Sequence, residues 1–377
     1  MFIHLINQTA PSGESDPIGM IMNVLWIGLI VFSMFYGQKI QTWMMLREIS
    51  GALDRLTFLK NEARKVSIQS VKEVRKKAEQ EDPSPRIDHF LEYFTIMPVN
   101  LDPSGIVPKI DHILNLREKR FEDEIKTMAP EANEIEINNL EGVLEVSVDL
   151  NSIFKVVRHF YLLGRKTMSL YVIMQVQMQL PLIMQIAEAY FAALKAFAGG
   201  QPIGDGAGPL LVGRMMLELD KKEVVKDTVL SETSIDGRKV ILVKAKGPGS
   251  SVGKPGEAIQ RIIEENKGKV SSIIMIDAAA KLEGEETGST AEGIGSAIGG
   301  YGVEKYKIEE VATKYKIPLE AVVVKQLLHE AISPMLEDIY DGVDIASARV
   351  KRLIQERTKE GDTVIVAGIG NSVGIGQ

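Results

Sequence analysis

Two aspartates and one histidine in the second half of the chain are side chains of the kind that bind divalent cations. Asp205 lies in the loop 204–208, and Asp277 directly follows the apolar run 270–276. His329 lies on a segment with the apolar spacing of a helix. Carboxylate and imidazole groups together form borderline metal sites, in which the metal polarises a carbonyl or activates water. The sequence therefore predicts a divalent-metal site at Asp205, Asp277 and His329.

Each of these residues also has a purely structural interpretation. Asp205 can cap the start of a helix while the neighbouring glycines form a turn. A single histidine on an apolar helix is more often a packed core residue than a ligand. The metal hypothesis therefore requires that the three side chains converge.

Glycine-rich loops accompany the candidate ligands, and each follows a predicted strand or precedes a predicted helix. In open α/β sheets, ligands bind beyond the carboxyl ends of the strands, so these loops predict a ligand-binding cleft for a small molecule. The predicted ligand-binding residues are Gly204, Gly206, Gly208, Lys246, Gly247, Gly249, Gly253, Lys254, Gly368, Gly370 and Asn371. The run 284–302 is interpreted either as a ligand loop or as a plain surface loop.

The loop 246–256 has a second interpretation as a phosphate site. Its backbone amides could bind an anion, with Lys246 or Lys254 adding positive charge. It is not a Walker A loop, because Pro255 stands where Ser or Thr is required. The loop 368–376 is expected to fray unless another part of the protein holds it.

The elements that would position these loops alternate between strand and helix. Strands are expected at 238–243, 270–276 and 362–367, and helices at 256–266, 308–315, 320–340 and 347–358. This order predicts a three-layer α/β domain over 201–377 with a largely parallel sheet.

The N-terminal half is expected to be α-helical and attached to a membrane. Residues 17–38 contain no charge and are long enough for one transmembrane helix. No Lys or Arg precedes this stretch and several follow it. The tail 1–16, with a glycosylation sequon at Asn7, is therefore expected outside, and the body in the cytoplasm, at the cell membrane.

A helical stalk is expected over 39–82 and a mainly helical domain over 83–200. The stalk is either an oligomerising coiled coil or one helix packed on the body. Residues 168–187 are also uncharged but contain four glutamines and Pro181. They are interpreted as a buried helix pair or a subunit interface rather than a second span.

Composition excludes several classes of site. The chain has 377 residues, no cysteine and a net charge of −7. Disulfides, thiolate nucleophiles and cysteine zinc sites are therefore absent, and no nucleic acid partner is expected.

The whole chain resembles an uncharacterised family of archaeal membrane proteins, and its last half resembles the hydrogenase-maturation and spore-germination endopeptidases. The shared motifs are GIGNSVG at 368–374, GDGAGPLLV at 204–212 and IIMIDAA at 273–279, together with His329. This resemblance implies a phosphorylase-like α/β fold in which Asp205, Asp277 and His329 bind a metal. In those families the G-x-G-N strand precedes the G-D loop, so the resemblance requires a circularly permuted sheet.

Three functions follow from these observations. The first is a membrane-anchored homo-oligomer whose α/β domain carries a ligand-binding cleft. The second is a metal-dependent hydrolase or peptidase-like enzyme, and the third is a nucleotide- or phosphoanion-binding module.

Overall fold

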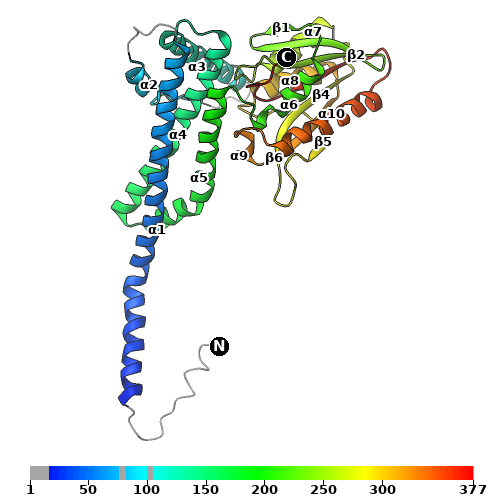
Figure 1. Cartoon of the computed structure of the whole chain (residues 1–377). Helices are drawn as coiled ribbons and strands as arrows, with labels where there is room; N and C mark the ends of the chain where they lie inside the picture. Colours follow the sequence, from blue (N-terminus) through cyan, green and yellow to red (C-terminus); the bar gives the residue numbers. More distant parts are fainter. Residues whose placement is uncertain (1–16, 76–81, 100–104, 377) are drawn as a thin grey trace. The chain divides into compact units, whose positions relative to one another are not determined.

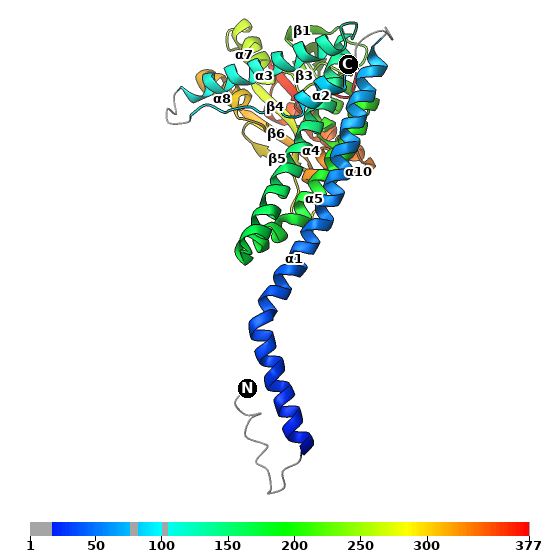
Figure 2. The ribbon, with the colours of Figure 1, turned by 90° about the vertical axis from the view of Figure 1, so that its left-hand side faces the viewer.

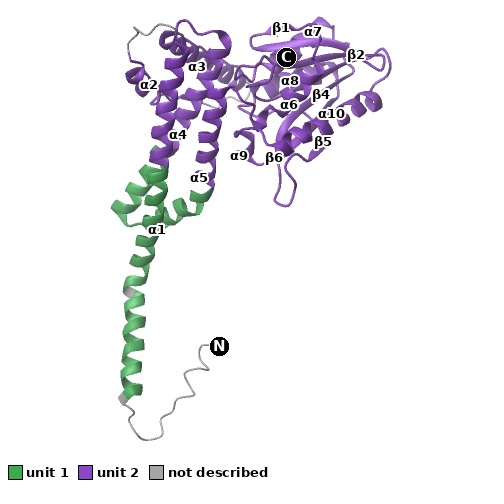
Figure 3. Cartoon of the chain, in the orientation of Figure 1, with its two compact units in different colours: residues 1–55, 155–181 green, residues 56–154, 182–377 purple. Residues whose placement is uncertain are grey.

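The computed structural model describes residues 17–75, 82–99 and 105–376. The expected tail 1–16 with its sequon lies outside these residues. The chain divides into two compact units (Figure 3). Unit 1 comprises residues 1–55 and 155–181, and unit 2 comprises residues 56–154 and 182–377.

The N-terminal half is α-helical, as the sequence predicts. Its first helix, α1, runs continuously from Pro17 to Val74 (Figure 2), so the predicted span and stalk are one element. The other helices of this half are α2 (Ser84–Phe90), α3 (Ile106–Met128), α4 (Glu134–Thr167) and α5 (Leu170–Gly199).

The apolar stripe of the predicted stalk is covered within the chain itself. In unit 1, Ile49 is fully buried, and in unit 2 Leu56, Leu59 and Val71 are buried as well. Ser67 on the same face donates a hydrogen bond to Ala63 and lies 2.8 Å from Ser147 of α4. These contacts favour a helix packed on the body between Ile49 and Val71, whereas Ile40, Trp43 and Met44, nearer the predicted span, are exposed.

Helix α5 differs from the predicted helix pair, because it continues unbroken through Pro181. An interior proline removes one intrahelical hydrogen bond and crowds the carbonyl four residues earlier, yet α5 continues past it. Within the described residues, α5 is the one helix that is long and apolar enough by itself to cross a membrane. The segments Ile18–Met34 and Tyr36–Val74 of α1 meet the same criterion as a bent pair.

The C-terminal domain is built on a seven-stranded mixed sheet with strand order β1-β2-β3-β7-β4-β6-β5. Strands β3, β7, β4 and β6 are parallel, whereas β1, β2 and β5 pair antiparallel with their neighbours. The prediction of a largely parallel sheet is thus right only for the centre. The strands are β1 (Lys222–Val225), β2 (Thr228–Ile235), β3 (Arg238–Ala245), β4 (Ser272–Ala280), β5 (Thr290–Ile294), β6 (Leu319–Gln326) and β7 (Thr363–Gly368).

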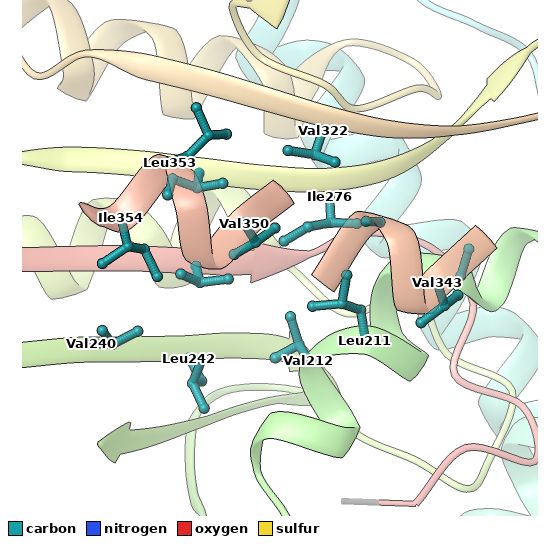
Figure 4. Close-up of a cluster of buried hydrophobic side chains, with 14 of the residues drawn as sticks. Leu211, Val212, Val240, Leu242, Ile276, Val322, Val343, Val350, Leu353 and Ile354 are labelled. Atoms are coloured by element: carbon teal, nitrogen blue, oxygen red, sulfur yellow. The ribbon is translucent and has the colours of Figure 1, made fainter. Parts of the chain in front are cut away.

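Helices cover both faces of this sheet (Figure 1). The helices are η1 (Gly204–Gly206), α6 (Ala207–Met215), α7 (Pro255–Glu265), α8 (Val303–Tyr315), α9 (Leu328–Ala331) and α10 (Glu337–Arg357). Side chains of α6 and α10 pack on one face of the central strands (Figure 4), and those of α7 and α8 on the other. The central strands are apolar on both faces because both are covered.

One predicted element has the wrong type. Residues 320–340 were expected to form a helix, but Leu319–Gln326 forms β6, and α10 begins only at Glu337. The β-branched run Val322–Val324 favours a buried strand, and a short apolar run does not distinguish the two types by periodicity. The run 284–302 likewise contains β5.

Helix α6 approaches the sheet so closely that Gly208 has no room for a side chain. A Cβ at this position would overlap the carbonyl oxygens of Ile276 on β4 and Ile369 after β7. Backbone atoms cannot move aside cheaply, so only glycine fits here.

We expect Gly208→Ala to lower the free energy of unfolding by about 1–3 kcal/mol despite the better helix propensity of alanine. Urea unfolding of the purified chain would measure this change. Gly299→Ala is the matched control, because a Cβ there meets no atom within 4 Å. Equal stability of the two variants would show that α6 does not pack against these strands as described.

Candidate functional site

The carboxyl ends of β3, β7 and β4 lie side by side, and their loops form the candidate site. The loop after β7 is held by the loop after β3, since Ser372 N donates to Ser251 O at 2.8 Å and Gly374 N donates to Pro248 O at 2.9 Å. Val373 and Ile375 are buried beneath them. The fraying expected for residues 368–376 is therefore prevented by these contacts.

Gly370 and Asn371 lie directly against Asp205. The Asp205 Oδ2 atom accepts a hydrogen bond from Asn371 N at 2.8 Å. Gly370 has φ +127°, and a Cβ there would overlap the carbonyl oxygen of Asp205. The loops 368–374 and 204–208, far apart in the sequence, are thus neighbours.

Asp277 is the second carboxylate of the site and is only 9% exposed. It lies near the end of β4, where its Oδ1 atom accepts a hydrogen bond from Ala278 N at 2.7 Å. Burial and the nearby charge of Asp205 raise the pKa of Asp277 to about 8. Burial also raises the pKa of Asp205, although the Asn371 amide opposes this shift. Ionising both carboxylates is therefore unfavourable, and binding a proton or a cation would lower this free-energy cost.

Asp205 and Asp277 both line a cleft of about 410 Å³. Helix α3 and the loops before α7 and α8 complete its wall. The ionisable carboxylates of the lining are Asp111, Glu118, Asp205, Asp277 and Glu304, against the single ammonium group of Lys254. Lys226 pairs with Glu118, and Lys307 pairs with Asp111 and Glu304. Among the described residues, Asp205 and Asp277 are therefore the lining carboxylates that a positively charged ligand would balance.

The loop 246–256 lacks the free positive charge of a phosphate site. Lys246 binds Glu134 at 2.8 Å and Glu223 at 2.9 Å, and Lys254 donates to Asn115 at 2.7 Å. The first amides of α7 are also occupied, because the Glu304 Oε2 atom accepts from Gly256 N at 2.7 Å. These contacts disfavour the anion-binding interpretation.

His329 is not brought into the cleft. It lies on α9, and the lining of the cleft does not include it. Across residues 17–75, 82–99 and 105–376, no group of three or more His, Asp or Glu side chains is arranged to hold a metal ion. The predicted three-ligand site is therefore reduced to the two aspartates. Gln326 lies beside Gly204 of the Asp205 loop. The side-chain amide of Gln326 is buried and has no hydrogen-bond partner in the described chain.

A row of acidic residues on α4 was not predicted. Glu141, Glu145 and Asp149 recur every four residues on one face of this helix. Burial and the neighbouring carboxylates raise the pKa of Glu141 to about 8, and burial raises that of Glu145, which binds Arg117 at 2.6 Å. The spacing was visible in the sequence, but charged residues at helical spacing usually form a solvated face.

The first two of these carboxylates line a second cavity of about 290 Å³. It shares with the cleft the wall residues Leu114, Glu118, Val252, Gly253, Lys254 and Tyr301. Its lining also contains Arg117, Lys226 and Lys254, so it is mixed in charge.

Comparison with known families accounts for nearly the whole chain. Residues 23–200 match the N-terminal domain of a protein of unknown function, DUF1512. Residues 203–376 match its C-terminal domain, described as a domain of unknown function (DUF1512). The chain belongs to the DUF1512 family. The resemblance to hydrogenase-maturation and germination endopeptidases is not part of this match and stays a prediction. A search of curated proteins found no match to the DUF1512 chain.

The raised pKa of Asp277 predicts how stability changes with pH. The folded protein keeps the Asp277 proton up to about pH 8, whereas the unfolded chain loses it near the ordinary value of 3.8. The contribution of Asp277 to the free energy of unfolding is therefore largest at acidic pH. It falls as the pH rises from about 3.8 to about 8, by at most about 1.4 kcal/mol per pH unit.

We expect Asp277→Asn to flatten the fall in unfolding free energy between pH 5 and pH 8, measured by urea unfolding in a chelator. Some slope will remain, because the pKa of Glu141 is also raised to about 8. The exposed α10 carboxylate Asp341 gives the control Asp341→Asn, which should follow the parent. Parallel curves for all three proteins would contradict the burial of an uncompensated Asp277.

Proposed function

We propose that the C-terminal domain binds a divalent cation between Asp205 and Asp277 and hydrolyses a substrate that enters the cleft. The observation that supports this proposal is the placement of Asp205 and the buried Asp277 in one cleft of about 410 Å³, where neither has an ion-pair partner among the described residues. Such a pair is unfavourable in the empty protein and becomes favourable when a cation neutralises it.

The ligand types favour a hard cation such as Mg²⁺ or Mn²⁺ over zinc. Mg²⁺ is commonly held by one or two carboxylates, with waters and the substrate completing the shell. Structural zinc sites instead have four protein ligands and no open coordination position, and their ligands usually include His or Cys. The absence of His329 from the cleft lining therefore changes the expected metal rather than the proposed chemistry.

A bound cation would polarise the scissile bond or lower the pKa of an attacking water. The residues of the chain position the reaction. The Asn371 amide orients Asp205, and the Ala278 amide orients Asp277. Gly370 lines the cleft without a side chain, so a substrate can approach the backbone there. Lys254, beside both cavities, can meet a negative group of the substrate only by exchanging its contact with Asn115.

We further propose that α1 anchors the protein in the cell membrane. The side chains between Ile18 and Met34 are uncharged, and the large apolar ones are exposed, Met34 by 81%. The Lys and Arg residues that follow favour a cytoplasmic body by the positive-inside rule. Association into a homo-oligomer stays a prediction.

We expect the full chain in detergent to bind Mn²⁺ or Mg²⁺ saturably, measured by isothermal titration calorimetry. Affinity should rise by up to tenfold per pH unit between pH 6 and pH 8, because the cation displaces the Asp277 proton. Asp205→Asn or Asp277→Asn should each weaken binding by at least about tenfold, since even second-shell changes cost 10–100-fold.

Two controls define the result. Asp341→Asn and His329→Gln should both bind the cation like the parent, because neither side chain lines the cleft. A parent that takes up no cation at any of these pH values would overturn the proposal. Full binding by both aspartate variants would place the cation elsewhere.

A further inference from the structure

The tip of the α4–α5 hairpin, residues 155–181 of unit 1, has an unusual surface for this chain. It contains four basic and no acidic residues, whereas the whole chain carries a net charge of −7. Arg158, Arg165 and Lys166 are exposed and make no ion pair with another described residue. We call residues 155–181 the basic hairpin.

The same hairpin exposes large apolar side chains. Leu162 is 45% exposed, Tyr171 70% and Met178 76%. Phe160, Met168 and Met174 are exposed as well. A soluble surface rarely combines so many exposed large apolar groups with charge of one sign, and this combination is typical of segments that lie at a membrane interface.

The hairpin lies beside α1 just after the uncharged stretch of that helix. Gln177 Nε2 donates a hydrogen bond to Glu48 Oε2 at 2.6 Å, which joins α5 to α1 within unit 1. Helix α5 starts at the α4–α5 turn, partway along α1, and runs in the same direction as α1 (Figure 1). The residues of α5 that precede Gln177 therefore lie beside the turns 39–48 of α1, next to the proposed span.

Helix α5 as a whole is long enough to cross a membrane, but its most exposed part is shorter than a span. The part of α5 in unit 1, 170–181, is about 18 Å long at 1.5 Å per residue, against a hydrocarbon core of about 30 Å. Beyond it, Ala187, Leu194 and Ala196 are fully buried in unit 2. The apolar composition that makes α5 a candidate span is thus used for packing in its second half.

We propose that the basic hairpin docks on the membrane surface, with its arginines and lysines on anionic lipid headgroups and Leu162, Tyr171 and Met178 in the interface. The positive charge of the basic hairpin favours an anionic membrane over a second copy of the chain as its binding partner. Two such hairpins would repel each other, whereas an anionic leaflet attracts them, by about fivefold in affinity per basic residue, the equivalent of about 1 kcal/mol. The inference rests on the proposed α1 anchor, which places unit 1 at the bilayer.

The experiment uses the full chain, which has no native cysteine to remove. Single variants Tyr171→Cys, Phe32→Cys and Ile294→Cys carry a fluorophore on the hairpin, on α1 and on the exposed end of β5. Each is reconstituted in vesicles of brominated phosphatidylcholine, with or without phosphatidylglycerol. Quenching by the brominated tails reports contact with lipid.

We expect strong quenching at position 32 in both vesicles and none at 294. Quenching at 171 should require phosphatidylglycerol. It should fall by about half or more at high salt, or when Arg158→Gln, Arg165→Gln and Lys166→Gln are combined. The triple variant keeps the apolar residues, so a loss of quenching reports the charge.

The alternative outcomes separate the inference from the anchor. Quenching at 32 without any at 171 would overturn the docking and leave the anchor in place. An unquenched position 32 would overturn the anchor itself. Deep, charge-independent quenching at 171 would indicate a span. A label shielded from both lipid and water would indicate a second copy. Either result would overturn the inference.

Discussion

The position of β7 between β3 and β4 is the constraint on which the rest of the C-terminal domain depends. This strand supplies the parallel partner for both neighbours, and the loop after it contacts η1 and the loop after β3. The hydrogen bond from Asn371 to Asp205 exists only because of that insertion. Without β7 the sheet would lose its centre, and the two aspartates would lose the backbone that confines them.

The charge balance of the cleft follows from how the protein uses its positive groups. Lys226 binds Glu118 and Glu122, Lys246 binds Glu134 and Glu223, and Lys307 binds Glu304. The pairs of Lys226 and Lys246 join α3 and α4 to the α/β domain, and those of Lys226 and Lys307 neutralise Glu118 and Glu304 of the cleft lining. Asp205 and Asp277 are left to be balanced from outside.

The sequence predicts the parts of the fold that rest on strong local patterns. The apolar runs at β3, β4 and β7 and the long helix α1 are recognisable because burial on both faces, or on one helical stripe, dictates their composition. Strands β1 and β5 escape prediction because they are short, partly exposed edge strands, and β2 because its exposed face is polar and breaks the apolar run. Strand β6 was mistaken for a helix because its valine run leads into genuine helical sequence.

The site divides in the same way. Asp205 and Asp277 could be predicted, because a carboxylate after a buried strand or in a glycine loop has a definite address in an α/β sheet. The exclusion of His329 and the burial of Glu141 depend on packing between distant segments, which no local pattern reports. Lys246 pairs with Glu134 and Glu223, and Glu304 accepts a hydrogen bond from Gly256. Local sequence does not predict these contacts, because the partners lie on other elements.

The central placement of β7 also governs how the domain can form. Its partner β3 ends more than a hundred residues earlier, so the contact that completes the sheet is among the most distant in the chain. Sheets that depend on such pairings fold slowly, because the entropy of closing the loop is lost before the strand contacts compensate it. Until β7 inserts, β3 and β4 present open, apolar edges to solvent. We therefore expect a domain that lacks the inserted β7 to aggregate, because unpaired apolar strand edges can pair with other chains.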